Sequence, residues 1–119
     1  PYSISSSPYQ AMEGILEVTV QKAGLFSTYL LEEAKVGDKV VVGEPTGDFY
    51  YDDLRDCNTI VAIAGGSGIT PFISMIKSIV EGSDDFNLIV FYGVRTRSDL
   101  LIDLDSVKHD KVKVIPVLS

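Results

Sequence analysis

A glycine-rich run, Gly65 to Pro71, is the part of the sequence whose residue types and spacing most directly suggest chemistry. Glycines at 65, 66 and 68 carry no side chain, so a ligand can approach the backbone closely. Backbone N–H groups at the start of a helix bind anions, phosphate groups in particular. The run therefore predicts a turn that binds the diphosphate of a nicotinamide dinucleotide. The alternative is a tight strand-to-helix connection that binds no ligand. The run lacks the Gly-Lys-Ser/Thr ending of a P-loop, which argues against nucleoside triphosphate hydrolysis.

The residues on either side predict the elements that such a turn needs. Thr59 to Ala64 is a continuous apolar run, typical of a strand buried on both faces of a parallel sheet. A helix is expected to follow, with Thr70 as its cap and Pro71 in its first position. Gly82 is expected to end it. Its buried face is expected to consist of Phe72, Met75, Ile76, Ile79 and Val80.

The remainder of the second half predicts two more strands with a helix between them. The strands are expected at Asn87 to Tyr92 and at Lys111 to Leu118, where Pro116 suggests a bulge or a strand end. Asp99 to Val107 is expected to form the helix, capped by Ser98. Strands alternating with helices are typical of one half of a doubly wound α/β domain.

The first half has a different pattern, mostly antiparallel strand with one small helix. We expect short strands at Tyr2 to Ser7, Ile15 to Val20 and Lys39 to Val42. The pair Ser27-Thr28 is expected to cap a helix that runs through Ala34. A polar stretch, Asp52 to Asp56, is expected to be a linker. The predicted organisation is thus a first domain over 1–51, a linker over 52–58 and a second domain over 59–119.

The bulk composition excludes some classes of partner. The formal net charge of −7 and the pI of about 4.5 argue against nucleic acid and anionic membrane surfaces. A single cysteine allows no disulfide within the chain and favours a reducing, cytoplasmic setting. No apolar run reaches the ~18 residues of a membrane segment. The scattered aspartates predict no metal site. The chain begins and ends abruptly, and we expect it to be a fragment of a longer protein.

Four separated features together resemble the ferredoxin–NADP reductase family of flavin-dependent reductases. Residues 1–3 resemble the tail of the family's Arg-x-Tyr-Ser flavin motif, and Gly24 to Ser27 its Gly-x-x-Ser. Pro45 to Phe49 is similar to the Pro-x-Gly-x-Phe that joins the two domains. Gly65 to Pro71, followed by Phe91 to Arg95, resembles the nicotinamide half. The resemblance implies the end of an antiparallel FAD-binding β-barrel followed by half of a Rossmann-like, parallel, three-layer α/β domain.

The resemblance also implies roles for individual residues. Tyr2 is expected to stack on the isoalloxazine and Ser3 to hydrogen-bond near the flavin N5. Ser27 and Thr28 are expected to receive the FAD diphosphate at a helix start. The residues expected to contact the nicotinamide dinucleotide are Gly65, Gly66, Ser67, Gly68 and Thr70. No side chain is expected to act as a catalytic acid or base.

Two arginines, Arg95 and Arg97, follow the second predicted strand, where the adenosine ribose of a dinucleotide is expected. Arginine can accommodate a 2′-phosphate, so the pair slightly favours NADP over NAD. The alternative is that both are solvent-facing loop charges.

The activity implied is hydride transfer between NAD(P)H and FAD, followed by electron transfer to an iron–sulfur or haem partner. Two alternatives stay open, an electron-transfer subunit of a larger complex and a non-catalytic nucleotide-binding regulatory module. Since the barrel is expected to be incomplete, these 119 residues alone are expected to be inactive.

Overall fold

A computed structural model describes residues 2–104 and 107–119 of the chain. Spatial contacts divide the chain into two compact units. One unit combines the residues up to Thr19 with those from Tyr50 onward, and the other comprises 20–49. No helix among the described residues is long and apolar enough to cross a membrane.

The larger unit contains a parallel three-stranded sheet. Its strands are β1 (Thr59–Gly65), β2 (Asn87–Val94) and β3 (Val112–Leu118), in the spatial order β1-β2-β3. The three predicted strands are therefore confirmed. Pro116 neither ends β3 nor bulges it, because it pairs with Tyr92 in an uninterrupted register. Among the described residues, β2 is the one strand beside β3, and a strand with one free edge tolerates a residue that has no N–H to donate.

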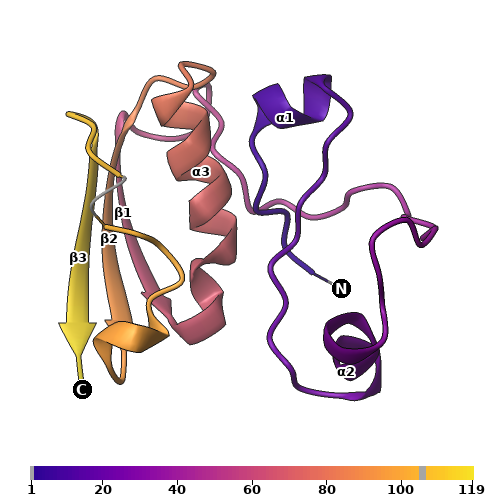
Figure 1. Cartoon of the computed structure of the whole chain (residues 1–119). Coiled ribbons are helices and arrows are strands. Elements are labelled where there is room, and N and C mark those ends of the chain that lie inside the picture. Colours follow the sequence, from indigo (N-terminus) through magenta and orange to yellow (C-terminus); the bar gives the residue numbers. More distant parts are fainter. Residues whose placement is uncertain (1, 105–106) are drawn as a thin grey trace. The chain divides into compact units, whose positions relative to one another are not determined.

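One helix, α3 (Thr70–Val80), covers one face of this sheet, as Figure 1 shows. Phe72, Ile76 and Ile79 on α3 are buried, and they share one hydrophobic core with alternate residues of the strands. Met75 is only partly buried and Val80 is half-exposed, so the predicted buried face was too wide by these two residues. The strand residues of this core are Ala62, Ala64, Leu88, Val90, Tyr92, Val94 and Val112.

The helix α3 ends where the sequence predicts. Gly82 has a φ of +83°, a conformation that favours glycine, and its N–H donates to the carbonyl of Ile79.

The opposite face of the sheet is exposed within this chain. Val61 and Ile63 on β1 are 60% and 84% exposed, and Phe91 and Val117 continue the same face on β2 and β3. The prediction that β1 is buried on both faces is therefore wrong for the described residues. They show two layers, the sheet and α3, and not the third.

The helix predicted over Asp99 to Val107 does not form in the part of that range that the structure describes. A short 3₁₀ turn, η2 (Arg97–Asp99), stands there instead, and its cap is Thr96 rather than Ser98. The Asp99 carboxylate accepts a hydrogen bond from the Thr96 backbone N–H, which closes a single turn, and Leu100 is extended. The last part of the predicted helix includes 105–106, which lie outside the described residues.

The strands predicted before residue 50 are absent from this part of the chain, all of which beyond residue 1 is described. Ile4 and Val18 form one isolated antiparallel bridge in place of two strands. A helix that the sequence did not predict, α1 (Pro8–Met12), is capped by Ser7. The residues expected to form a strand at 39–42 are exposed and have no regular structure. An alternating sequence forms a strand only when a partner strand completes the hydrogen-bonded ladder. The described residues before 50 contain no such partner, and the predicted FAD barrel is not seen among them.

The smaller unit contains the helix α2 (Leu25–Glu32). Gly24, rather than the predicted Ser27-Thr28 pair, stands at the cap position, and α2 ends before Ala34. Ser27 lies inside the first turn, where its hydroxyl accepts the backbone N–H groups of Ala23 and Gly24 at 2.8 and 2.9 Å. Ser27 still satisfies backbone donors at the helix start, although from a position three residues later than a cap.

Candidate nucleotide-binding site

The glycine run forms a turn at the carboxyl end of β1. A short 3₁₀ helix, η1 (Gly66–Ile69), connects β1 directly to α3. Gly66 has a φ of +53°, which an L side chain rarely adopts, so the turn requires glycine there. At Gly65 and Gly68, by contrast, an added Cβ would meet nothing within 4 Å. Packing within the chain does not require glycine at these two positions, and the space above the turn is open to a ligand.

The predicted cap at Thr70 is corrected by the structure. Thr70 is the first residue of α3, Ile69 stands at the cap position, and Thr70 is buried. The 3₁₀ helix moves the start of the helical run back to Gly66, so Gly66, Ser67 and Gly68 are its first residues. The first N–H groups of a helix lack partners within it, and the helix dipole places partial positive charge there. All three residues are exposed, so this backbone faces solvent.

A buried tyrosine, Tyr92 on β2, holds the turn from beneath. Its hydroxyl donates to the carbonyl of Gly66 at 3.0 Å. Burial raises the pKa of this phenol, and a hydrogen bond from the backbone of Leu101 opposes that shift. One hydroxyl therefore joins the glycine turn to the connection that follows β2. Sequence analysis missed Tyr92, although a tyrosine among the inward-facing Leu88 and Val90 is a signal that a buried hydroxyl needs a partner.

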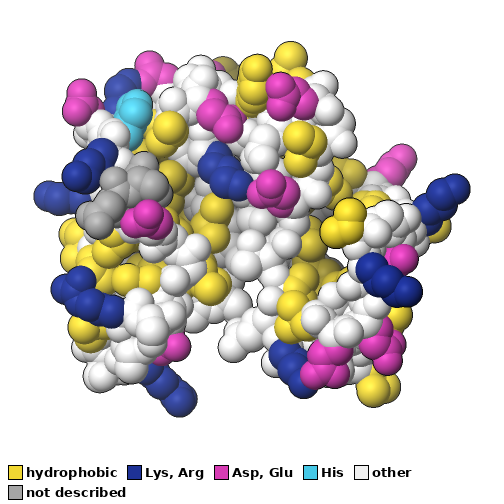
Figure 2. Space-filling view, viewed as in Figure 1, with side chains coloured by type: hydrophobic (Ala, Val, Ile, Leu, Met, Phe, Trp, Pro, Cys, Tyr) yellow, Lys and Arg dark blue, Asp and Glu magenta, His cyan; other side chains and the backbone are white. Residues whose placement is uncertain are grey.

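The structure brings Arg95 and Arg97 to the same edge of the sheet as the turn. Gly65, which ends β1, pairs in register with Gly93, and Arg95 directly follows the end of β2. Both arginines are exposed. Figure 2 shows that the Lys and Arg side chains on the face in view form no continuous patch. The two arginines are thus local positive charges in a chain whose formal net charge is −7.

The residues predicted to contact flavin lie in two different units. Tyr2 and Ser3 are exposed, next to the bridge at Ile4. Ser27 is buried and Thr28 partly so, both within α2. Within the described ranges, no three His, Cys, Asp or Glu side chains gather as a metal site.

Comparisons with known proteins show what the chain is similar to. Residues 62–119 match a family model described as the oxidoreductase NAD-binding domain. The chain is 34% identical over 98 residues to a flavohemoprotein of Oceanobacillus iheyensis, covering 80% of this chain and 24% of that protein. It is 30% identical over 99 residues to the anthranilate 1,2-dioxygenase electron transfer component of Acinetobacter baylyi, covering 83% and 28%. This chain is a relative of the ferredoxin reductase-type flavin oxidoreductases.

Solved structures of such reductases share its fold. A ferredoxin reductase in carbazole 1,9a-dioxygenase superposes with a TM-score of 0.70 at 24% identity, over 99% of this chain and 36% of that one. The resemblance inferred from the sequence is confirmed, as is a Rossmann-like parallel arrangement. The chain spans less than a third of the length of the two relatives from Oceanobacillus iheyensis and Acinetobacter baylyi.

Proposed function

We propose that this chain is part of an FAD-dependent NAD(P)H oxidoreductase, and that the turn from Gly65 to Thr70 binds the diphosphate of the nicotinamide dinucleotide. The open glycine turn between β1 and α3 carries this proposal, in a chain related to flavin reductases. When bound, the cofactor pair supplies hydride transfer between nicotinamide and flavin and then single electrons for an acceptor. No side-chain acid or base is needed in that reaction.

The chain's own contribution at this turn is electrostatic and geometric. The backbone N–H groups of Ser67 and Gly68 lie at the start of a helical run and hold the diphosphate. The net charge of −7 gives the chain no attractive field for phosphate, so these local dipoles must supply the attraction. Tyr92 keeps the turn in place through the Gly66 carbonyl.

Arg95 and Arg97 bear on which nicotinamide dinucleotide the chain binds. Both follow β2 at the carboxyl edge of the sheet, where an adenosine ribose would lie beside a diphosphate on the glycine turn. A guanidinium forms bidentate hydrogen bonds with phosphate. We therefore favour NADP over NAD.

The flavin half of the proposal rests on the family resemblance. Tyr2 would stack on the isoalloxazine, Ser3 would hydrogen-bond near N5, and Ser27 and Thr28 would receive the FAD diphosphate. Exposed positions of Tyr2 and Ser3 leave them accessible to a cofactor. The corresponding boundaries are 1–51 for the end of the flavin domain, 52–58 for the linker and 59–119 for the nicotinamide domain.

The electron acceptor is proposed from the relatives. The one from Acinetobacter baylyi is named as an electron transfer component of a dioxygenase, and the one from Oceanobacillus iheyensis as a flavohemoprotein. Both names support an electron acceptor, either as a separate protein or as a further domain, and the resemblance implies that this acceptor is an iron–sulfur or haem partner. They favour a reductase, alone or as a subunit of a complex, over a non-catalytic regulatory module. A cytoplasmic location remains a prediction from the single cysteine.

A charge placed on the turn tests the proposal. In the full-length protein, Gly68→Asp should weaken binding of the nicotinamide dinucleotide by at least ~10-fold, because a carboxylate would face the diphosphate. The open space around Gly68 lets the variant fold. Gly43→Asp is the matched control, since an added Cβ there also meets nothing within 4 Å. Isothermal titration calorimetry measures the affinity of each variant for the nicotinamide dinucleotide. Equal affinities of the two variants would refute the site.

A further inference from the structure

The helix α3 has a polar face opposite its buried apolar face. Ser74 and Lys77 are three residues apart, so they lie on the same side of the helix. The Ser74 hydroxyl donates to the backbone carbonyl of Ser6 at 2.6 Å, and the Lys77 ammonium pairs with the Glu17 carboxylate at 2.9 Å. Two side chains of α3 therefore contact a segment 60 or more positions earlier in the chain.

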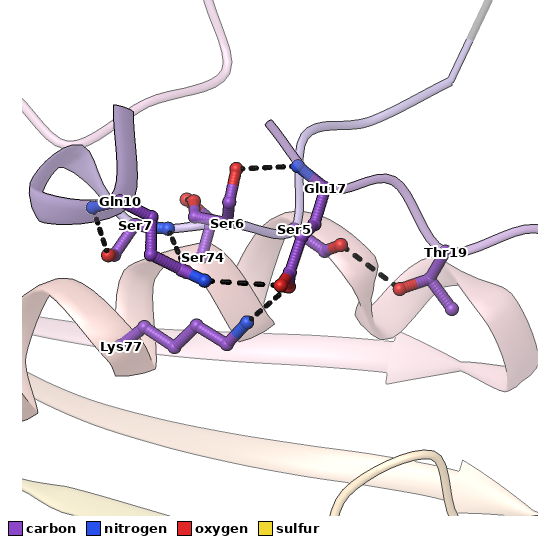
Figure 3. A network of polar contacts seen from close by, with 8 residues as sticks. All are labelled: Ser5, Ser6, Ser7, Gln10, Glu17, Thr19, Ser74 and Lys77. Atoms are coloured by element: carbon purple, nitrogen blue, oxygen red, sulfur yellow. Dashed lines mark hydrogen bonds and ion pairs between the residues drawn. The ribbon is translucent and has the colours of Figure 1, made fainter. Parts of the chain in front are cut away.

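Hydrogen bonds also connect residues of that earlier segment with one another, as Figure 3 shows. The backbone N–H of Glu17 donates to the Ser6 hydroxyl at 3.0 Å, and the Gln10 amide donates to the Glu17 carboxylate at 3.1 Å. The hydroxyls of Thr19 and Ser5 are hydrogen-bonded at 3.0 Å. These bonds make residues 5–19 one hydrogen-bonded unit, so a contact at Glu17 or Ser6 restrains the whole segment.

Three consecutive serines, Ser5, Ser6 and Ser7, are each 2% exposed. Burying a hydroxyl is unfavourable unless it is hydrogen-bonded, and each of these has a partner within the segment. Glu17 is the member that joins both parts of the network, since its backbone contacts Ser6 and its carboxylate contacts Gln10 and Lys77. Because hydrogen bonds are directional, the network fixes how the segment 5–19 lies against α3 more strictly than an apolar contact would.

The two ends of this network lead to the two proposed cofactor sites. Tyr2 and Ser3, the proposed isoalloxazine contacts, lie immediately before the bridge between Ile4 and Val18. At the other end, α3 continues directly from the glycine turn proposed to bind the dinucleotide. Hydride transfer depends steeply on the distance and angle between donor and acceptor, and misplacement by ~1 Å can lower a rate 100-fold.

We propose that Ser74 and Lys77 are positioning residues that attach the flavin-contacting segment to α3 and thereby set the geometry between flavin and nicotinamide. The inference rests on the proposed function. Neither side chain touches a cofactor in it, and neither contributes to binding either one. They act through Ser6 and Glu17.

Charge reversal across the Glu17–Lys77 pair tests this in the full-length protein. The variants are Glu17→Lys, Lys77→Glu and the double variant. The control is Lys111→Met, which removes a surface ion pair between Lys111 and Asp85. The side chains of Lys111 and Lys77 are similarly exposed. Each single variant should reduce the rate constant of flavin bleaching at saturating NAD(P)H by about 10-fold, because like charges then face each other. Flavin content and the Kd for the nucleotide should stay unchanged. The double variant should recover most of the rate.

Ser74→Ala provides a second, milder measurement that removes one hydrogen bond without adding charge. It should lower the bleaching rate constant by about 3-fold and leave the nucleotide Kd unchanged. Single variants that bleach at the rate of Lys111→Met, or a double variant that recovers nothing, would overturn the positioning role. If the wild-type protein shows no bleaching of bound flavin by NAD(P)H, the proposed function fails and the positioning role fails with it. A wild type that bleaches normally, with unaffected variants, refutes the positioning role alone.

Discussion

Tyr92 joins the proposed diphosphate turn to β2. Its buried hydroxyl donates to the Gly66 carbonyl and receives a hydrogen bond from Leu101. Tyr92→Phe removes both hydrogen bonds, and a typical hydrogen bond within a protein contributes ~0.5–1.5 kcal/mol to its stability. We expect that loss in the free energy of unfolding, measured by urea titration of the full-length protein.

Tyr9→Phe serves as the control for this prediction, because Tyr9 is 53% exposed. It should leave the free energy of unfolding unchanged. Identical stabilities for the two variants would mean that the Tyr92 hydroxyl bond contributes nothing to the turn.

Arg95 and Arg97 decide the choice of dinucleotide if our proposal holds. Replacing both with Ala should weaken NADPH binding more than NADH binding, by ~1.5–3 kcal/mol, because charge-assisted hydrogen bonds to the 2′-phosphate are lost. Separate titrations of the full-length double variant with each nucleotide measure the difference. A control at Lys113, which lies within β3, is Lys113→Ala. Equal losses for NADPH and NADH would show that the arginines do not contact the 2′-phosphate.

At this scale the sequence predicts what local geometry requires. Gly66 has a φ of +53°, a conformation that favours glycine, so the residue type by itself indicates a turn at this position. The cap at Thr70 was wrong because the 3₁₀ turn before it moves the start of the helical run by four residues. Tyr92 was missed because its partner, Gly66, is 26 positions away, and no local pattern encodes that pair.

Among the elements, the three parallel strands and α3 were predicted and the rest mostly was not. A continuous apolar run such as Ile60 to Ala64 is typical of a buried strand. The alternating pattern over 15–20, in contrast, forms a strand only where a partner strand completes the ladder. The helix predicted from Asp99 onward does not form in its described part, because the Asp99 carboxylate accepts a hydrogen bond from the Thr96 backbone and closes a single turn instead. Short polar side chains of this kind offer the backbone an alternative to a helix.

The contact between α3 and the N-terminal segment should depend on pH. The hydrogen bond and charge of Lys77 hold the pKa of Glu17 below its ordinary value. A folded pKa below the unfolded one contributes stability above the unfolded pKa, and this contribution is lost as the pH falls through the folded pKa. Glu17→Gln should therefore lower the free energy of unfolding near neutral pH and cease to matter once the pH has fallen below the folded pKa of Glu17. Because Glu17 is half-exposed, we expect a difference below about 1 kcal/mol.

Urea titrations of wild type and variant at several pH values measure this difference. The exposed Glu13 provides the control, Glu13→Gln, which should follow the wild type throughout. A gap between wild type and Glu17→Gln that persists unchanged into acid would show that the Lys77 contact is not its source.

At the scale of the whole molecule, the described residues leave one apolar face of the sheet uncovered. Ile63 and Phe91 are register neighbours on that face, at 84% and 39% exposed. The sequence predicted burial on both faces because the run is apolar throughout, and a run of residues carries no information about what covers it. The same limit applies to residues 20–49, where the resemblance implied barrel strands and the structure, which describes all of them, has one helix and no strand.

These observations predict how the 119 residues behave as an isolated chain. A flavin barrel needs closure to bury its inner face and remove its sheet edges, and the two segments that resemble flavin motifs here belong to units without a barrel strand. The glycine turn needs only β1, β2 and α3, all of which form. The chain should therefore retain no stoichiometric FAD and show no NAD(P)H oxidation. Weak binding of phosphate or nucleotide at the turn should persist. The measurement is a visible spectrum after incubation with excess FAD and desalting, with free-phosphate titration of the same sample as the control for a folded turn. A flavin band near one equivalent would show that flavin binding needs no closed barrel.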